Sequence, residues 1–171
     1  MSVEDEPLFP NLLPNDRDPE QNEPRLREQI EHLVTNQLYG VLCTQGQGQP
    51  YGSIVAFAFS KDLTYAVFAT PVATRKFRLL SECDRVALVV DNRPLYPNDM
   101  MKVEAATATG KATNVERGPK FDEYAILLTD RHPQLDIFVK ASSCALFRID
   151  VYRFFHVTRF QEVGQWVPPS R

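Results

Sequence analysis

The sequence predicts a mainly β protein in which six antiparallel strands close into a small barrel flanked by short helices. Three observations carry this prediction. From residue 38 onward, short runs rich in β-branched and aromatic residues alternate with turn residues. Tight turns alone separate the first three runs, so these should pair in sequence as an antiparallel meander. Six strands in a chain of 171 residues would leave exposed edges in an open sheet, and closure removes them.

The first 24 residues predict an extended arm outside the barrel. They hold seven acidic residues, one arginine and five prolines, a composition that buries too little apolar surface to fold alone. We therefore divide the chain into an arm over residues 1–24 and one folded domain over residues 25–171. Large apolar side chains at Leu8, Phe9, Leu12 and Leu13 leave docking on a neighbouring surface as an alternative to a solvated arm.

The folded domain begins with an amphipathic helix over residues 25–37, because apolar side chains recur there at helical spacing. Two shorter helices are expected over residues 74–82 and 119–129. The segments 46–50 and 61–63 are typical of tight turns. The strands are expected over residues 38–45, 51–60, 64–70, 85–91, 102–115 and 143–157.

Composition and missing motifs argue against several classes of function. No apolar run is long enough to span a membrane, and the acidic N-terminus lacks the basic start of a secretory signal, so we expect a cytoplasmic protein without membrane partners. The strands 51–60 and 64–70 carry no Lys or Arg, which argues against a nucleic-acid-binding face. Hydrolase triads, a Walker A loop and a dinucleotide-binding glycine motif are also missing.

Metal binding is not expected from the cysteines or histidines. Cys43, Cys83 and Cys144 lie far apart and predict small buried side chains rather than a disulfide framework or a thiolate site. The three histidines are too scattered for a linear zinc motif, and exposure on the surface is the expectation for each of them: His32, His132 and His156.

The segment Thr74-Arg75-Lys76 has the pattern of an anion-binding site. Thr74 is a good helix N-cap, which places both cations in the first helical turn, where the helix dipole disfavours positive charge. A bound phosphate would offset this cost, since backbone N–H groups, a guanidinium and an ammonium would converge on one anion. Solvation of both side chains, or pairing with Glu82 or Asp91, is the structural alternative.

A resemblance to the pyridoxamine 5′-phosphate oxidase-like family, the FMN-binding split barrels, rests on three segments. They are GVLCTQGQGQPYGSIVAFAFSKDLTYAVFATPVATRKFRLLSECDRVALVVDN, then ATATGKATNV, then SSCALFRIDVYRFFHV, within about residues 26–166. The resemblance implies a split barrel of the FMN-binding type. It also implies a homodimer with flavin sites at the subunit interface.

The resemblance further implies site residues. Thr74, Arg75 and Lys76 would hold the flavin phosphate. The ring and ribityl chain would be lined by Ser53, Ile54, Val55, Ala56 and Thr70, with Asn92 as a further candidate. Trp166 would either cover the partner subunit's flavin or pack on the end of the barrel.

One departure from the family pattern concerns the substrate. The Arg-Leu-His type motif of authentic pyridoxamine phosphate oxidases is missing after Val157, so we do not expect vitamin B6 oxidation. The expected function is a flavin-dependent oxidoreductase acting on a small molecule, with FMN as cofactor and FAD or a deazaflavin as alternatives. No catalytic residue is assigned, because the flavin itself transfers the hydride. A non-catalytic flavin store and a haem-binding split barrel, with His132 at the pocket, are the other possibilities.

Overall fold

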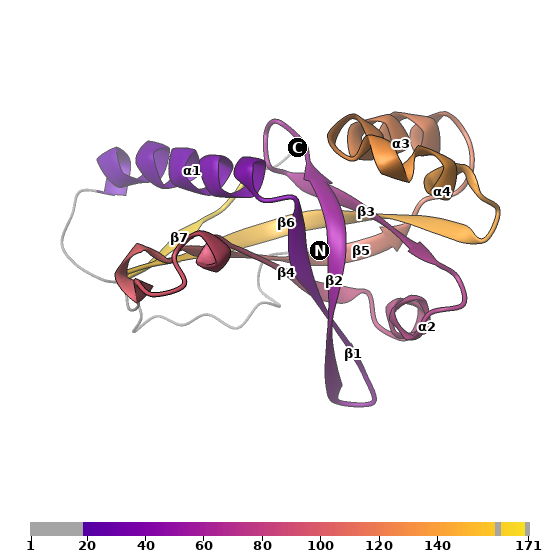
Figure 1. Ribbon diagram of the computed structural model, residues 1–171, viewed down its shortest axis with the longest axis horizontal. Helices are drawn as coiled ribbons and strands as arrows, with labels where there is room; N and C mark the ends of the chain where they lie inside the picture. The colour runs from indigo at the N-terminus through magenta and orange to yellow at the C-terminus, as the bar shows by residue number, and fades with distance from the viewer. Residues whose placement is uncertain (1–18, 160–161, 170–171) are drawn as a thin grey trace.

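Seven antiparallel strands form one continuous sheet in the computed structural model, which describes residues 19–159 and 162–169. The strand order is β3-β2-β1-β4-β5-β6-β7, and a further pairing of β3 with β6 closes six strands into a barrel, with β7 added at the edge (Figure 1). The strands are β1 Tyr39–Gly46, β2 Gln49–Phe59, β3 Tyr65–Pro71, β4 Arg85–Asp91, β5 Ala105–Asn114, β6 Cys144–Thr158 and β7 Glu162–Trp166.

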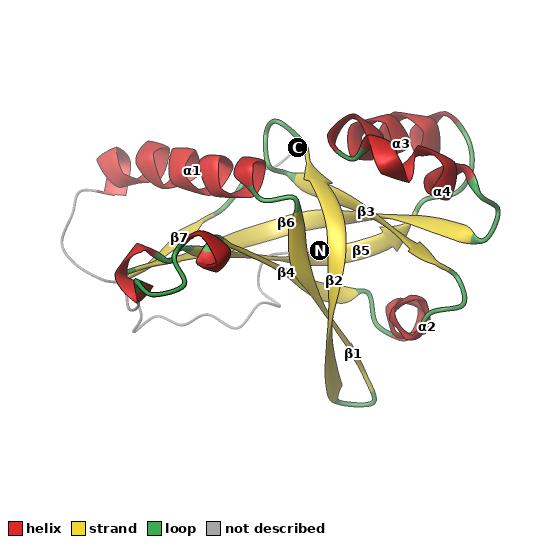
Figure 2. Cartoon of the chain, viewed as in Figure 1, coloured by secondary structure: helices red, strands yellow, loops and turns green. Residues whose placement is uncertain are grey.

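The helices flank this barrel, with α1, α3 and α4 along the upper side and α2 at the lower right of Figure 2. The α-helices are α1 Pro19–Asn36, α2 Arg75–Glu82, α3 Pro119–Arg131 and α4 Asp136–Lys140. The short 3-10 turns are η3 Arg93–Leu95, η4 Met100–Lys102 and η5 Pro133–Leu135. None of the described helices combines the length and the apolar composition needed to cross a membrane.

Two apolar clusters stabilise the fold. The larger fills the barrel and is covered by Ile30 and Leu33 of α1. The smaller lies outside the barrel, where Val67 of β3 and Leu146 of β6 pack against Leu128 of α3. Because β3 and the beginning of β6 are covered on both faces, residues 65–68 and 144–147 are buried without alternation.

The barrel is split between β2 and β3. Residues 57–59 of β2 pair with residues 66–68 of β3, whereas residues 49–56 pair with β1. On its other edge, β3 pairs with β6 along its whole length. As a result β1 and β2 leave the barrel together as a hairpin that lies next to α2 (Figure 1). One edge of β2 and the start of α2 therefore border the same opening.

The predicted mainly β barrel with flanking helices is confirmed, including the meander of the first three strands. Two predicted boundaries are wrong. The first helix begins at Pro19, so that residues 19–24 are helical rather than part of an arm, and Pro24 lies inside the helix. A proline there forfeits one backbone hydrogen bond, which is a cost that a helix packed on a barrel can absorb. Residues 1–18 lie outside the described residues.

The predicted strand over residues 102–115 begins later, at Ala105, because Met100–Lys102 forms a 3-10 turn. The sequence did not predict β7, which pairs with the end of β6 as a hairpin. Gly164 of β7 lies against α1: an added Cβ would come within 3.0 Å of the Leu26 side chain. A larger residue there would have to displace the Leu26 side chain, so the glycine helps α1 to approach this strand closely.

A candidate anion-binding corner at the start of helix α2

Thr74 and Thr70 form the base of the candidate site. Thr74 is the N-cap of α2, and its Oγ1 accepts a hydrogen bond from the Phe77 amide at 3.2 Å. The same hydroxyl lies 3.1 Å from Oγ1 of Thr70, which is 1% exposed at the end of β3. The strand end and the helix start are thus joined by two threonine side chains, which fixes the direction in which α2 begins.

Arg75 and Lys76 follow in the first turn, as the sequence predicts. The Arg75 guanidinium is exposed and lies over the Tyr51 ring, with 5.1 Å between Cζ and the ring centroid. Lys76 is half-buried, and this burial lowers the pKa of its ammonium group. Neither cation forms an ion pair with another described residue, and Asp91 pairs with Arg93 instead. The ion-pairing alternative is therefore wrong within the described residues.

The four predicted residues of β2 divide between two faces of the strand, because successive side chains alternate. Ser53 and Val55 point to one face, and the Oγ of Ser53 is inaccessible without a hydrogen-bond partner among the described residues. Ile54 and Ala56 point to the other face, where Ile54 is 74% exposed. The four side chains do not line one surface together. What they share is the free backbone edge of β2 at the opening.

Asn92 lies away from this corner. It follows β4 at the end of the strand remote from α2, about 20 Å along the strand from Arg85. Its side-chain Oδ1 accepts a hydrogen bond from the Glu104 amide at 2.7 Å and joins two chain segments. Within the chain, Asn92 therefore does not meet Arg75.

Trp166 belongs to the core. It is 5% exposed, and its ring lies 5.7 Å from the ring of Phe154, between centroids. Of the two interpretations that the sequence left open, packing at the end of the barrel is the one that the structure favours.

The predicted exposure of the histidines is wrong for two of the three. His32 is exposed on α1, but His132 is fully buried, and its Nε2 lies 2.9 Å from the carbonyl oxygen of Phe57. His156 on β6 is buried as well. The contact of His132 engages Nε2, whereas Nδ1 is buried without a hydrogen-bond partner among the described residues. The ring is fully buried, so no ligand reaches it from the surface in this structure.

The thiols behave as small buried side chains. Cys144 is buried and Cys43 is half-buried at the start and the middle of their strands. Burial raises the pKa of both thiols, which keeps them protonated near neutral pH. Neither is therefore an activated nucleophile.

Sequence reasoning missed two features that the structure brings to a functional surface. Tyr51 meets Arg75 only because the β1–β2 hairpin leans on α2, where Gly46 lies against Leu79. A cavity lined by His156 forms where α1, η4 and the β6–β7 hairpin meet. Its residues are far apart in sequence, so no local motif could have indicated it.

The chain is similar to a known protein family and to several solved structures. A family model described as pyridoxamine 5′-phosphate oxidase matches residues 26–151. No curated protein matches the chain. Among solved structures, a haem-binding protein from Mycobacterium smegmatis is similar with a TM-score of 0.73 and 17% identity, over 82% of this chain and 57% of that one. The chain thus spans little more than half the length of that protein.

Two further solved structures are similar along most of their own length. A haem storage protein from Vibrio cholerae has a TM-score of 0.65 and 17% identity, over 83% of this chain and 94% of that one. A FAD-binding protein from Mesorhizobium loti has a TM-score of 0.61 and 14% identity, over 76% of this chain and 90% of that one. At such low identity the similarity shows the fold.

Proposed function

The chain belongs to the pyridoxamine 5′-phosphate oxidase-like split-barrel family, and on that premise we propose that it binds FMN and acts as a flavin-dependent oxidoreductase on a small molecule. The observation that carries this proposal is the start of α2. Two cations lie there at the positive end of a helix dipole, one of them half-buried, and neither is neutralised by a described residue. A phosphate group supplies the missing negative charge.

The residues present fit a flavin phosphate. Arg75 offers a planar guanidinium that its contact with Tyr51 holds in place, and Lys76 offers an ammonium group. The first backbone N–H groups of α2 have no helical acceptor and point toward the same region. The orphaned Oγ of Ser53 and the free edge of β2 supply polar groups beside the corner for the rest of the cofactor.

A bound flavin supplies hydride transfer through its ring, while the protein supplies binding, orientation and exclusion of water. Arg75 and Lys76 would bind the phosphate and so fix the position of the ring along β2. FAD and deazaflavins carry a comparable phosphate and remain outcomes of the test. A non-catalytic flavin store would make the same contacts, and turnover of the bound flavin with an electron donor and an acceptor separates it from an enzyme.

The test is the absorption spectrum of the purified protein, followed by mass analysis of any chromophore released by heat or acid. We expect the bands of oxidised flavin and a released molecule with the mass of FMN. A colourless protein that takes up no added FMN would overturn the proposal. Reduction and reoxidation of the bound flavin by a donor and acceptor at a catalytic rate would support the enzyme over the store.

Haem is the second candidate, because two of the similar structures are described as haem proteins. The histidines bear on it directly, since haem needs an axial ligand. His132 is fully buried, which leaves the exposed His32 and the cavity-lining His156 as the candidates among the described residues. A Soret band in the same spectrum, lost on His156→Ala substitution, would favour haem over flavin.

A further inference from the structure

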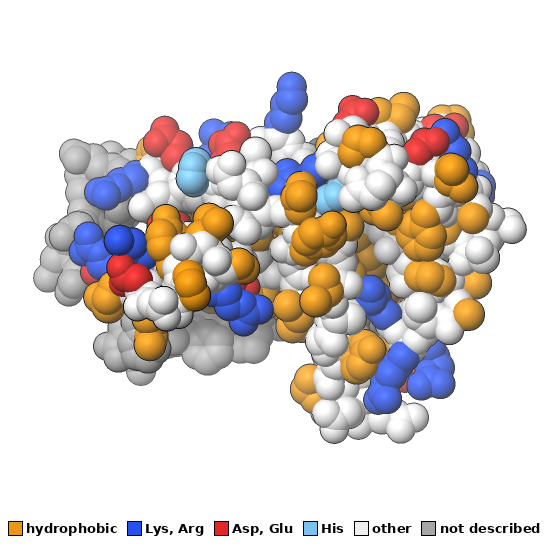
Figure 3. Space-filling view, viewed as in Figure 1, with side chains coloured by type: hydrophobic (Ala, Val, Ile, Leu, Met, Phe, Trp, Pro, Cys, Tyr) orange, Lys and Arg blue, Asp and Glu red, His pale blue; other side chains and the backbone are white. Residues whose placement is uncertain are grey.

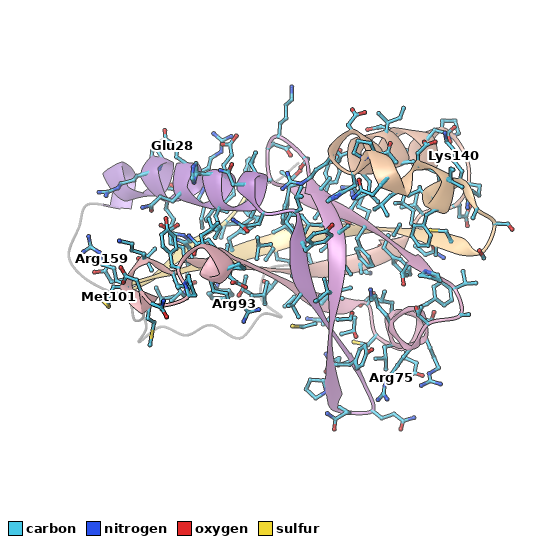
Figure 4. All side chains as sticks on the ribbon, in the orientation of Figure 1. Glu28, Arg75, Arg93, Met101, Lys140 and Arg159 are labelled. Atoms are coloured by element: carbon cyan, nitrogen blue, oxygen red, sulfur yellow. The ribbon has the colours of Figure 1, made fainter. Side chains whose placement is uncertain are left out.

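A cavity of about 460 Å³ lies at the end of the molecule away from Arg75. Figure 4 shows Met101 and Arg159, which line the cavity, at the left, and Arg75 at the lower right. Its walls come from α1, from η4 and the residues after it, and from β6 and β7. The volume lies within the range that small-molecule sites have in proteins.

His156 forms a buried polar group on the wall of this cavity. Its side chain is 3% exposed, and its Nε2 lies 3.5 Å from Oε2 of Glu104, which is longer than an ordinary hydrogen bond. No described residue gives Nε2 a hydrogen bond. Apart from the long contact with Glu104, this buried ring nitrogen has no partner among the described residues, and a ligand that accepts a hydrogen bond from it would offset the cost of its burial.

Cationic side chains from three elements surround the same cavity. Arg25 lies on α1, Lys102 on η4 and Arg159 after β6, whereas two carboxylates, Glu104 and Glu162, face it. Arg25 has no ion pair with a described residue. Lys102 pairs with Asp99 at 3.2 Å and Arg159 with Glu162 at 3.6 Å. Both are exposed pairs of little net strength, so their cations can turn to a ligand.

We propose that this cavity binds a small molecule carrying an oxyanion, either a carboxylate or a phosphate, which contacts Arg25 and Lys102 and accepts a hydrogen bond from Nε2 of His156. The inference goes beyond the proposed flavin binding and does not depend on it. The cations select for negative charge at the mouth of the cavity. The buried imidazole adds a donor at its wall, which a solvated patch of surface cations would lack.

Binding of an oxyanion here is coupled to protonation of His156. Burial lowers the pKa of this imidazole more than the nearby Glu104 carboxylate raises it, and so the ring is neutral in the free protein at neutral pH. The other charged groups around the cavity are Arg25, Lys102, Arg159 and Glu162, and Tyr96 adds a hydroxyl. A bound oxyanion favours the imidazolium, so affinity should rise as the pH falls toward the lowered pKa.

The experiment follows the three histidine ring resonances by NMR as a function of pH, in sulfate and in chloride of equal ionic strength. Sulfate is the probe because it keeps its charge across the range. We expect the His156 titration to move to higher pH in sulfate, while the exposed His32 and the buried His132 respond alike to both salts. Sulfate should bind more tightly at pH 6 than at pH 8 by roughly two- to fivefold, since a nearby opposite charge commonly moves a pKa by about one and the pKa of His156 starts below its ordinary value.

The matched variants are Arg25→Gln and Arg27→Gln on the same helix. Arg25 lines the cavity, whereas Arg27 pairs with Glu31 and does not line it, so only the first should weaken sulfate binding, by several-fold. Inorganic phosphate and oxalate then distinguish the two sources of the oxyanion. An unchanged His156 titration, an equal movement of His32, or equal sulfate affinity in both variants would overturn the proposal.

Discussion

Arg75 is the residue on which flavin retention should depend most. Arg75→Ala removes a charge-assisted contact to phosphate, which should lower FMN affinity by roughly 10- to 100-fold. The side chain is exposed, so the free energy of unfolding should change by less than about 0.5 kcal/mol. Fluorescence titration with FMN and urea unfolding measure the two effects.

The control is Arg78→Ala, an exposed arginine in the same helix beyond its first turn. Riboflavin, which lacks the phosphate, should bind both variants and the wild-type chain equally. Equal FMN affinity of the two variants would contradict the placement of the phosphate at the start of α2.

Lys76 should affect stability and binding in opposite directions. Burial lowers the pKa of its ammonium group. Below this lowered pKa the charged ammonium destabilises the folded state, and above it the folded protein carries the neutral amine and this cost disappears. Lys76→Met removes the charge and keeps the apolar stem, so the flavin-free protein should melt at a higher temperature. FMN affinity should fall by about tenfold, because one charge on the phosphate loses its partner.

The pH dependence checks the same point. FMN affinity of the wild-type chain should decrease as the pH rises toward the lowered pKa of Lys76, and this decrease should be absent in Lys76→Met. Thermal unfolding and FMN titration across alkaline pH give both readings. A variant that is less stable without flavin would show that the Lys76 ammonium has an unseen partner.

At the residue scale, the sequence predicts those features that depend only on neighbouring residues in the chain. Thr74 is recognisable as an N-cap, and the two residues after it must lie in the first turn of a helix. Trp166 and His132 were not predictable in this way. Their burial depends on Phe154 and on the Phe57 carbonyl, which the fold brings to them from other elements.

Helix α1 is held at its end by a residue of another helix. The Arg131 guanidinium donates to the carbonyl oxygens of Val34 at 2.7 Å and Thr35 at 2.9 Å, and also to that of Gln37. These carbonyls at the helix end have no helical donor. Arg131→Met should therefore lower the free energy of unfolding by about 1.5–3 kcal/mol, as for hydrogen bonds to a charged group.

Urea unfolding measures this effect, with Arg27→Met as the control because Arg27 makes an exposed pair within α1. Arg27→Met should stay within about 0.5 kcal/mol of wild type. In Arg131→Met, amide protection from hydrogen exchange should decrease first at the C-terminal turns of α1. Similar stability of the two variants would mean that water replaces Arg131 at these carbonyls without cost.

At the element scale, the long strands were predictable and the short ones were not. β6 alternates buried and half-buried residues over much of its length, so its pattern identifies it. β7 has five residues, among them Gly164, and its existence depends on pairing with β6 and on contact with α1. A segment of five residues does not indicate that it will pair with β6 or contact α1. The early start of α1 was missed because Pro24 usually marks the beginning of a helix.

On the scale of the whole molecule, the split of the barrel explains why the candidate corner exists. If β2 paired with β3 along its full length, the hairpin would be part of the barrel and α2 would have no opening beside it. The sequence predicts six strands and closure, but not the point at which two neighbours part. That point depends on where β2 leaves β3, while β3 stays paired with β6 along its whole length through contacts between distant segments.

The last prediction concerns assembly, which the family resemblance implies as a homodimer. Figure 3 shows hydrophobic side chains at the surface over β1 and β2. Leu38, Tyr39 and Ile54 are among the exposed apolar residues, with Ile54 at 74%. A second copy that covers this surface would complete the flavin site, whose opening borders the same strand.

Ile54→Lys should therefore convert a dimer into a monomer and weaken FMN binding in the same variant. The control is Ile137→Lys on α4. Ile137 is 85% exposed, so if exposure alone decided the effect, this substitution would disturb the dimer more than Ile54→Lys. Sedimentation velocity with and without FMN measures the association, and fluorescence titration measures the affinity. A monomeric wild-type chain, or dissociation caused by Ile137→Lys and not by Ile54→Lys, would place the interface elsewhere. Loss of the dimer with unchanged FMN affinity would instead show that one protomer supplies all the contacts to the cofactor.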